Sequence, residues 1–385
     1  MGNNLFRNFL LSVYLLLLFA NRYFGIAIIN LLLYAFGFIC FLFYFFRAIE
    51  GRIRFCFKTF FLVICLLINI IFVINYNQNL SFFSVFIAAS YFGAALLMNN
   101  TVIKSKLSYL PFIFNCFYLA LFYIRDRSFV NVFADQSVNY VSIMMILSLF
   151  PIYISQYQNG LKRSNYGVIC ISIFFSVLAL GRGGILSCIL LLFLTIYYRI
   201  FNEKLKRNAI LMVMVVMVGI IFMGLLAVIL PRLLGHLPGF QEKGMDSNGR
   251  LLVWGIWLAK NFSSAKGIIF GENVISNIPD VFPHLHNSYL MFYADYGLIG
   301  FLFCIFCLIK LGAFLHKTNT SLFSLFFVFC FRAFTDVVFG NFYGDFFLFY
   351  FIIIYFYKSK KLFSVYDKFS VFARRKENCK NLSIQ

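Results

Sequence analysis

The chain is poor in charged residues. Only 12% of its 385 residues are Asp, Glu, Lys or Arg, whereas about a quarter of the residues of a soluble domain are charged. This scarcity excludes an ordinary soluble protein. The ten cysteines do not suggest a disulfide framework, because most of them fall within apolar segments and none falls in the largest polar loop. The sequence also lacks internal repeats and low-complexity linkers.

Apolar residues make up 62% of the chain, and they are arranged in long runs. A bilayer core about 30 Å thick is crossed by about 20 apolar residues, and runs near that length recur throughout the sequence. We therefore predict an all-α, polytopic integral membrane protein with about 12 transmembrane helices. The predicted spans are 6–20, 23–46, 59–76, 82–98, 107–124, 139–156, 166–180, 185–198, 209–230, 288–309, 321–338 and 346–357.

Basic residues indicate how these spans are oriented. Lys and Arg accumulate in cytoplasmic loops, and here they are concentrated in alternate gaps between the spans. Both termini are therefore predicted to be cytoplasmic. The net charge of +20 is interpreted as a topology signal and an attraction to anionic lipid, not as a nucleic-acid-binding surface. The basic tail either lies on the inner membrane surface or is disordered.

The spans and gaps divide the chain into five parts. Residues 166–198 as one helix would be about 50 Å long, well beyond the bilayer core, so we predict two short spans joined by an outer turn at Gly181-Arg182-Gly183-Gly184. The parts are N-terminal transmembrane helices (1–165), the spans around this turn (166–230), a large outer loop (231–287), C-terminal transmembrane helices (288–357) and a cytoplasmic tail (358–385).

The large outer loop contains one helical pattern, in residues 247–262. Ser247 or Asn248 can cap this helix at its start. Both tryptophans of the chain, Trp254 and Trp257, fall within it. Because indole favours the interface between lipid and water, we expect the helix to lie on or just above the bilayer.

Four segments of the second half carry a family resemblance: ALGRGGILS at 179–187, NGRLLVWGIW at 248–257, HLHNSYLMFYADYGLIG at 284–300 and RAFTDVVFG at 332–340. In them the chain resembles the superfamily of O-antigen polymerases and O-antigen ligases. The region that members of this superfamily share combines an arginine-glycine turn between two spans, a large periplasmic loop and a histidine at the entrance of the next span. The first half matches only in its run of spans. The spacing from His286 to Gly297 and Gly300 is similar to the ligase motif, whereas VNYVSIMMILSLFPIYIS at 138–155 favours the polymerases.

The resemblance implies a GT-C-like membrane glycosyltransferase of the bacterial inner membrane, with its active site on the periplasmic face. It implies metal-independent transfer without a cofactor, and polymerase activity is favoured. The donor and the acceptor would both be undecaprenyl-diphosphate-linked oligosaccharides, and a chain-length regulator is a further possible partner. Two alternatives remain. A ligase would deliver the glycan to lipid A core, and a transporter would flip lipid-linked sugars, although ionisable residues would then be expected along a central cavity.

The chemistry of such a transfer requires a base and cations. A histidine titrates near neutral pH, so His286 suits the activation of a sugar hydroxyl. Arginine binds phosphate oxygens through two parallel hydrogen bonds without a metal, and the resemblance assigns this role to Arg182 and Arg250. Each residue also has a purely structural interpretation. His286 could be a polar helix cap, Arg182 an interfacial anchor and Arg250 a solvated residue near a helix start.

Two further charges, Arg332 and Asp336, lie four residues apart in a predicted span and can neutralise each other. They could be a buried pair that locks two helices. Alternatively, Asp336 orients His286 or the acceptor sugar, and Arg332 supports it. Three more residues are given supporting roles: Asn287 within the histidine motif, Asp295 as a cavity residue, and His284. His284 and His286 could bind a metal, but a two-residue spacing does not share a helix face and further ligands are not evident, so we expect no metal.

Overall fold

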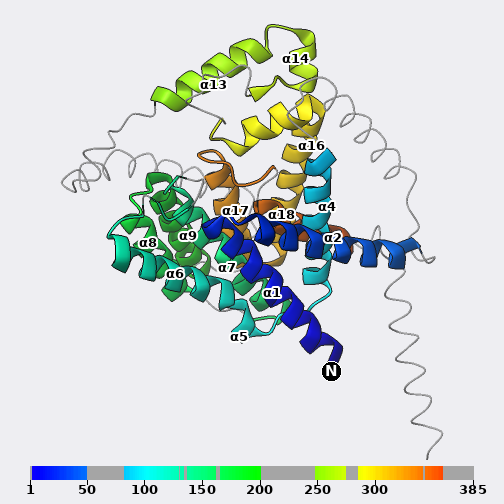
Figure 1. The fold of residues 1–385 in the computed structure, drawn as a ribbon, viewed down its shortest axis with the longest axis vertical. Helices are drawn as coiled ribbons and strands as arrows, with labels where there is room; N and C mark the ends of the chain where they lie inside the picture. The colour runs from blue at the N-terminus through cyan, green and yellow to red at the C-terminus, as the bar shows by residue number, and fades with distance from the viewer. Residues whose placement is uncertain are drawn as a thin grey trace, which may run out of the picture.

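The computed structural model describes residues 2–49, 82–129, 131–133, 137–161, 165–200, 248–274, 285–340 and 343–358. Within these ranges all regular secondary structure is helical (Figure 1), so the predicted all-α class is confirmed for this part of the chain. The predicted spans 59–76 and 209–230 lie outside the described residues, as do His284, Ser247 and residues 359–385 of the predicted tail.

Six of the helices are long and apolar enough to cross a bilayer, and four shorter ones are apolar as well. Each of the ten overlaps a predicted span. The longer ones are α1 (Gly2–Phe24), α2 (Ala27–Ile49), α6 (Leu110–Asp126) continuing from the short α5 (Ser105–Ser108), α7 (Tyr140–Gln158), α9 (Arg182–Ile200) and α16 (Ser288–Thr318). The shorter ones are α4 (Phe82–Asn99), α8 (Tyr166–Leu178), α17 (Thr320–Ala333) and α18 (Gly344–Lys358).

Helix α7 forms the centre of the bundle. In its most apolar stretch of 18 residues 94% of the residues are buried, and the helix packs against α6, α8, α9 and α17. A helix that is apolar all round is expected to be enclosed in this way. Helix α2 is the opposite case, because only 11% of its most apolar stretch is buried and residues such as Ile28, Leu31 and Ile39 are exposed. Such a surface suits contact with lipid tails.

The helices alternate in direction, so their ends gather at two poles. At one pole Arg7 of α1 donates to the Asn100 carbonyl at 3.0 Å, and Ser155 near the end of α7 donates to the Ile103 carbonyl at 2.9 Å. At the other pole α13 (Asn248–Asn261) and α14 (Ala265–Phe270) lie beyond the start of α16 (Figure 1). This grouping agrees with the alternation predicted from the basic residues.

Helices α8 and α9 confirm that residues 166–198 form two helices. The turn between them differs from the prediction, because its left-handed residue is Leu180, with φ 53°, and Arg182 already begins α9. Gly183 and Gly184 therefore lie in the first turn of a helix. Their lack of a side chain serves close packing there, as the site shows.

Helix α17 ends earlier than predicted, at Ala333 and not near residue 338. The backbone beyond it bonds elsewhere, since the N–H groups of Val338 and Phe339 donate to the Ser288 hydroxyl at 2.6 and 3.2 Å. Asp336 therefore lies in a turn after the helix. Its pairing with Arg332 survives this change.

Helix α16 extends to Thr318, beyond the predicted end at 309, and it is interrupted at Gly297. There φ is +67° and ψ is −176°, a conformation that favours glycine. A Cβ added at Gly297 would lie 2.3 Å from the Ile269 carbonyl oxygen, so the absence of a side chain at this position permits close packing. Its neighbour is α14, a helix that the sequence pattern did not indicate.

The tryptophans of α13 face the protein. Trp257 has no exposed surface, its ring centre is 5.7 Å from that of Tyr293, and its indole donates to the Glu272 carbonyl at 3.2 Å. It belongs to a small second core with Val253, Val274, Leu285, Tyr293 and Ala294. The lipid-interface role predicted for the tryptophans is therefore wrong for Trp257, because a fully buried indole contacts protein and not headgroups.

Candidate functional site

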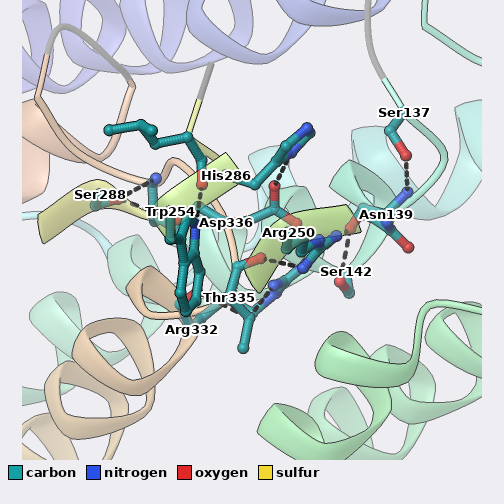
Figure 2. Close-up of polar contacts among 12 residues, drawn as sticks. Ser137, Asn139, Ser142, Arg250, Trp254, His286, Ser288, Arg332, Thr335 and Asp336 are labelled. Carbon is teal, nitrogen blue, oxygen red and sulfur yellow. Dashed lines mark hydrogen bonds and ion pairs between the residues drawn. The ribbon is translucent and has the colours of Figure 1, made fainter. Parts of the chain in front are cut away.

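Six segments of the chain meet at the pole near α13. They are the end of α1, the start of α7, the first turn of α9, helix α13, the start of α16, and the end of α17 with the turn that follows. The polar contacts among most of these segments are drawn in Figure 2. Of the residues singled out in the sequence, His286, Arg250, Arg332 and Asp336 are brought together here.

His286 stands immediately outside α16 in a constrained conformation. Its φ is 50°, in the left-handed region where residues other than glycine are uncommon. Asn287 follows as the N-cap, and its side-chain oxygen accepts from the N–H groups of Tyr289 and Leu290 at 2.9 and 3.1 Å. The cap falls to Asn287 and not to His286, so the interpretation of His286 as the polar cap is wrong. Constrained residues of this kind concentrate at functional sites.

Asp336 links His286 to Arg332. One carboxylate oxygen, Oδ1, lies 3.8 Å from His286 Nδ1, and the other, Oδ2, accepts from Arg332 Nη2 at 2.9 Å. The side chains of Asp336 and Arg332 are 2% and 3% exposed, whereas that of His286 is 22% exposed. The arrangement therefore runs from a buried cation through a buried carboxylate to an imidazole that reaches the surface (Figure 2).

The charge on Asp336 follows from its neighbours. Burial disfavours the charged carboxylate, but the charge of Arg332, the interaction with His286 and the charge of Arg250 together hold the pKa of Asp336 below its usual value of 3.8. The carboxylate is therefore ionised at neutral pH. An ionised carboxylate beside an imidazole orients the ring and stabilises the imidazolium that forms when the ring takes a proton.

Ser288 holds this turn in place, a role that no sequence pattern indicated. Its hydroxyl donates to the Asp336 carbonyl at 3.1 Å while accepting from Val338 and Phe339, and its own N–H donates to the same carbonyl at 3.2 Å. The start of α16 and the turn after α17 are thereby joined. The distance between His286 and Asp336 is fixed at the backbone.

Helix α13 forms hydrogen bonds to the same two segments. Arg250 donates from Nη1 to the Thr335 carbonyl at 2.7 Å, and the Trp254 indole donates to the Leu285 carbonyl at 2.5 Å. Residues 250 and 254 lie on one face of the helix, four residues apart. Each accepting carbonyl belongs to the residue directly before Asp336 or His286. We refer to Arg250 and Trp254 as the α13 clamp.

The first turn of α9 packs directly on Arg332 and on α7. A Cβ added at Gly183 would lie 3.1 Å from Arg332 Nη1, and one added at Gly184 would lie 2.0 Å from Ser142 Oγ. Larger residues would therefore displace the buried arginine or α7. Arg182, half-buried, begins this turn. Its backbone is thus adjacent to the cluster, at a helix N-terminus whose dipole favours an anion.

Arg332 is held by further groups of this pole. Besides Asp336, it donates to the Thr335 hydroxyl and, at 3.3 Å, to the Asn139 carbonyl that precedes α7. These bonds join α17 to α7. The pair of Arg332 and Asp336 therefore acts structurally as well as electrostatically, and the two interpretations made from the sequence are compatible.

Asp295 does not join this cluster. It is buried in α16, about 10 Å along the helix axis from Ser288, and its charge interaction is with Asp345. The Asp345 carboxylate accepts from the Gly340 N–H at 2.8 Å. The role of Asp295 as a cavity residue stays a prediction. Within the part of the chain that the structure covers, no three His, Cys, Asp or Glu side chains are grouped to hold a metal ion.

The fold and the site together define a class: an apolar helical protein with an arginine, carboxylate and histidine cluster at one pole of its bundle. Comparison with known proteins adds no narrower identity, since no family model, curated protein or solved structure matches the chain.

Proposed function

We propose that this protein is a membrane glycosyltransferase, an O-antigen polymerase of the bacterial inner membrane. It transfers a growing glycan from undecaprenyl diphosphate to the sugar of a second undecaprenyl-diphosphate-linked repeat unit. The observation that carries the proposal is the partly exposed His286 beside the buried, ionised Asp336, with arginines around them. Both termini are assigned to the cytoplasm, and the pole near α13 to the periplasm.

In the proposed reaction His286 is the general base. Its Nδ1 faces Asp336, so Nε2 is the nitrogen that takes the proton from the acceptor hydroxyl. The hydroxyl oxygen forms a bond to the anomeric carbon of the donor while the bond to the diphosphate oxygen breaks. The diphosphate leaves with the electron pair, and direct displacement inverts the anomeric carbon.

Arg182 and Arg250 are assigned to the leaving diphosphate. Its negative charge increases as the bond to the sugar breaks, and donors already in position stabilise that charge. A guanidinium presents several N–H groups in one plane, which suits two phosphate oxygens. Arg250 uses one of these groups, on Nη1, for the Thr335 carbonyl.

The direct test is glycan transfer by purified protein in detergent with lipid-linked repeat units and EDTA. The expected result is chain growth in the presence of EDTA and its loss in His286→Ala. The melting temperature of the variant should stay near the parent value, because the Asn287 cap and the Ser288 bonds that hold the segment are retained. Undiminished transfer by His286→Ala would overturn the assignment of the base.

The ligase remains the second candidate, because the spacing from His286 to Gly297 and Gly300 is similar to the ligase motif. It uses the same donor chemistry with lipid A core as acceptor. Cells that lack the gene distinguish the two. Loss of a polymerase leaves single repeat units on the core, whereas loss of a ligase leaves none and polymer accumulates on the lipid carrier.

A further inference from the structure

Arg22, in the last turn of α1, lies beside the site described above. Its guanidinium carbon is 4.8 Å from the centre of the Tyr140 ring and 5.3 Å from that of Tyr343. Contacts of this kind between a cation and aromatic faces are attractive. The Tyr343 hydroxyl also accepts from Asn21 Nδ2 at 2.8 Å. The guanidinium therefore contacts the rings of α7 and of the residue that precedes α18.

Both rings belong to segments that build the site. Tyr140 begins α7, directly after Asn139, whose carbonyl accepts from Arg332. Tyr343 precedes α18, on the segment that continues from the turn containing Asp336. Arg22 is thus placed at the edge of the cluster by the same pieces of chain that position Arg332 and Asp336.

Electrostatics point the same way. The charges of Asp336, Arg22, Arg332 and Arg250 all act on the Tyr140 hydroxyl, so all four groups lie within electrostatic range of it. The charges of Asp345 and Arg22 both act on Tyr34. Arginines outnumber carboxylates in this group. Cations at such depth are costly unless an anion offsets them.

Resting on the function proposed above, we infer that Arg22 is a third arginine for the donor diphosphate, contributed by the N-terminal half of the chain. The guanidinium lies over both rings and also hydrogen-bonds to the Tyr343 side chain. A guanidinium presents several N–H groups in one plane, which suits two phosphate oxygens of a diphosphate bound beside it. The aromatic rings fix that plane before the substrate arrives. The family resemblance, which lies in the second half of the chain, does not extend to this residue.

A purely structural role predicts something different. If Arg22 only joins α1 to α7 and α18, its replacement lowers the stability of the bundle and leaves donor affinity per folded molecule unchanged. If it binds the diphosphate, donor affinity falls and acceptor affinity does not. The two effects are measured separately.

The experiment is binding of undecaprenyl diphosphate without sugar to the purified full-length protein, in parallel with transfer kinetics. For Arg22→Gln we expect the Kd to rise roughly 10- to 100-fold, as for loss of a charge-assisted pair of hydrogen bonds, with a similar rise in donor KM and an unchanged acceptor KM. The matched control is Arg125→Gln, which removes an arginine whose side chain is 73% exposed and pairs with Asp126. The control should bind and transfer like the parent.

Measurements on the parent protein distinguish failure of the Arg22 inference from failure of the proposed function. If the parent transfers glycan and folded Arg22→Gln keeps the parental Kd and donor KM, the role of Arg22 is overturned while the function stands. If the parent neither binds the probe nor transfers glycan, the function itself fails. Should Arg22→Gln not fold, Arg22→Lys retains the charge but not the planar donors. Parental affinity in that variant would overturn the inference, and roughly 10-fold weaker binding would support it.

Discussion

Replacing Asp336 by asparagine removes a charge from the centre of the site with little change in shape. In the proposed reaction His286 becomes positively charged as it takes the acceptor proton, 3.8 Å from Asp336 Oδ1. With an effective dielectric constant of about 20, two unit charges at that distance attract by about 4 kcal/mol. If desolvation cancels half of this attraction, about 2 kcal/mol remains, which corresponds to a rate loss of about 30-fold. We therefore expect kcat of Asp336→Asn to fall by at least that factor.

The same change also affects stability, because Arg332 loses its counter-ion at 2.9 Å. Removal of one partner of a buried pair costs about 3 to 5 kcal/mol. Asparagine keeps an oxygen that accepts from Arg332, so the lower end is expected. Adding Arg332→Met removes the unpaired cation. The double variant should regain part of the lost melting temperature, whereas its transfer rate should stay low because the carboxylate beside His286 is still missing.

The assay is transfer by purified protein, expressed per folded molecule and accompanied by a melting curve in the same detergent. Asp126→Asn is the matched control, because Asp126 also pairs with an arginine, Arg125, at 2.8 Å but lies outside the site. Its rate and melting temperature should be those of the parent. A parental rate in folded Asp336→Asn would refute the reasoning, and so would a double variant that recovers rate together with stability.

Three further predictions concern the α13 clamp, the arginines and pH. Trp254→Phe keeps an aromatic ring but leaves the Leu285 carbonyl without its donor, so kcat should fall about 5-fold for a loss of about 1 kcal/mol. An unchanged kcat would mean that the indole contributes only packing. Arg182→Lys and Arg250→Lys should each raise the donor KM, because an ammonium does not reproduce the paired hydrogen bonds of a planar guanidinium. Full activity in both variants would mean that these arginines only fix the position of the chain at the membrane interface. The pKa of Asp336 is lower in the folded protein than its usual value of 3.8. The ionised carboxylate therefore contributes its full stabilisation of the fold at pH values well above 3.8, and this stabilisation is lost as the pH falls through the pKa of the folded protein. The melting-temperature difference between parent and Asp336→Asn should therefore narrow as the pH falls below about 4.

Hydropathy predicted the helices of the described residues well and their ends less well. A run of apolar residues near the bilayer thickness is a local property, and each such run among these residues is a helix. Helix ends depend on distant partners. Helix α17 stops at Ala333 because the backbone beyond it bonds to Ser288, which lies about 50 residues away in sequence. No local pattern encodes that bond.

The site was predictable to the extent that its chemistry is local or follows from topology. The four-residue spacing of Arg332 and Asp336 indicated their pairing, and the alternation of basic loops placed His286 and Arg250 at one pole with them. Ser288 and Arg22 were missed for the same reason as the helix ends. Serine after a helix cap and arginine at a helix end are common, and only tertiary contacts distinguish these two.

The α13 clamp explains why arginine, and not another cation, suits position 250. Its Nη1 holds the carbonyl before Asp336, and Trp254 holds the carbonyl before His286. In the proposed reaction another edge of the same guanidinium meets the diphosphate. The planar guanidinium of Arg250 then holds the diphosphate at a fixed position relative to Asp336. Because Asp336 orients His286, the distance between the base and the diphosphate is set by this rigid group. Lysine would supply the charge without that geometry. In this proposal the outer helix is part of the catalytic framework, and its sequence should tolerate change mainly on the face away from Arg250 and Trp254.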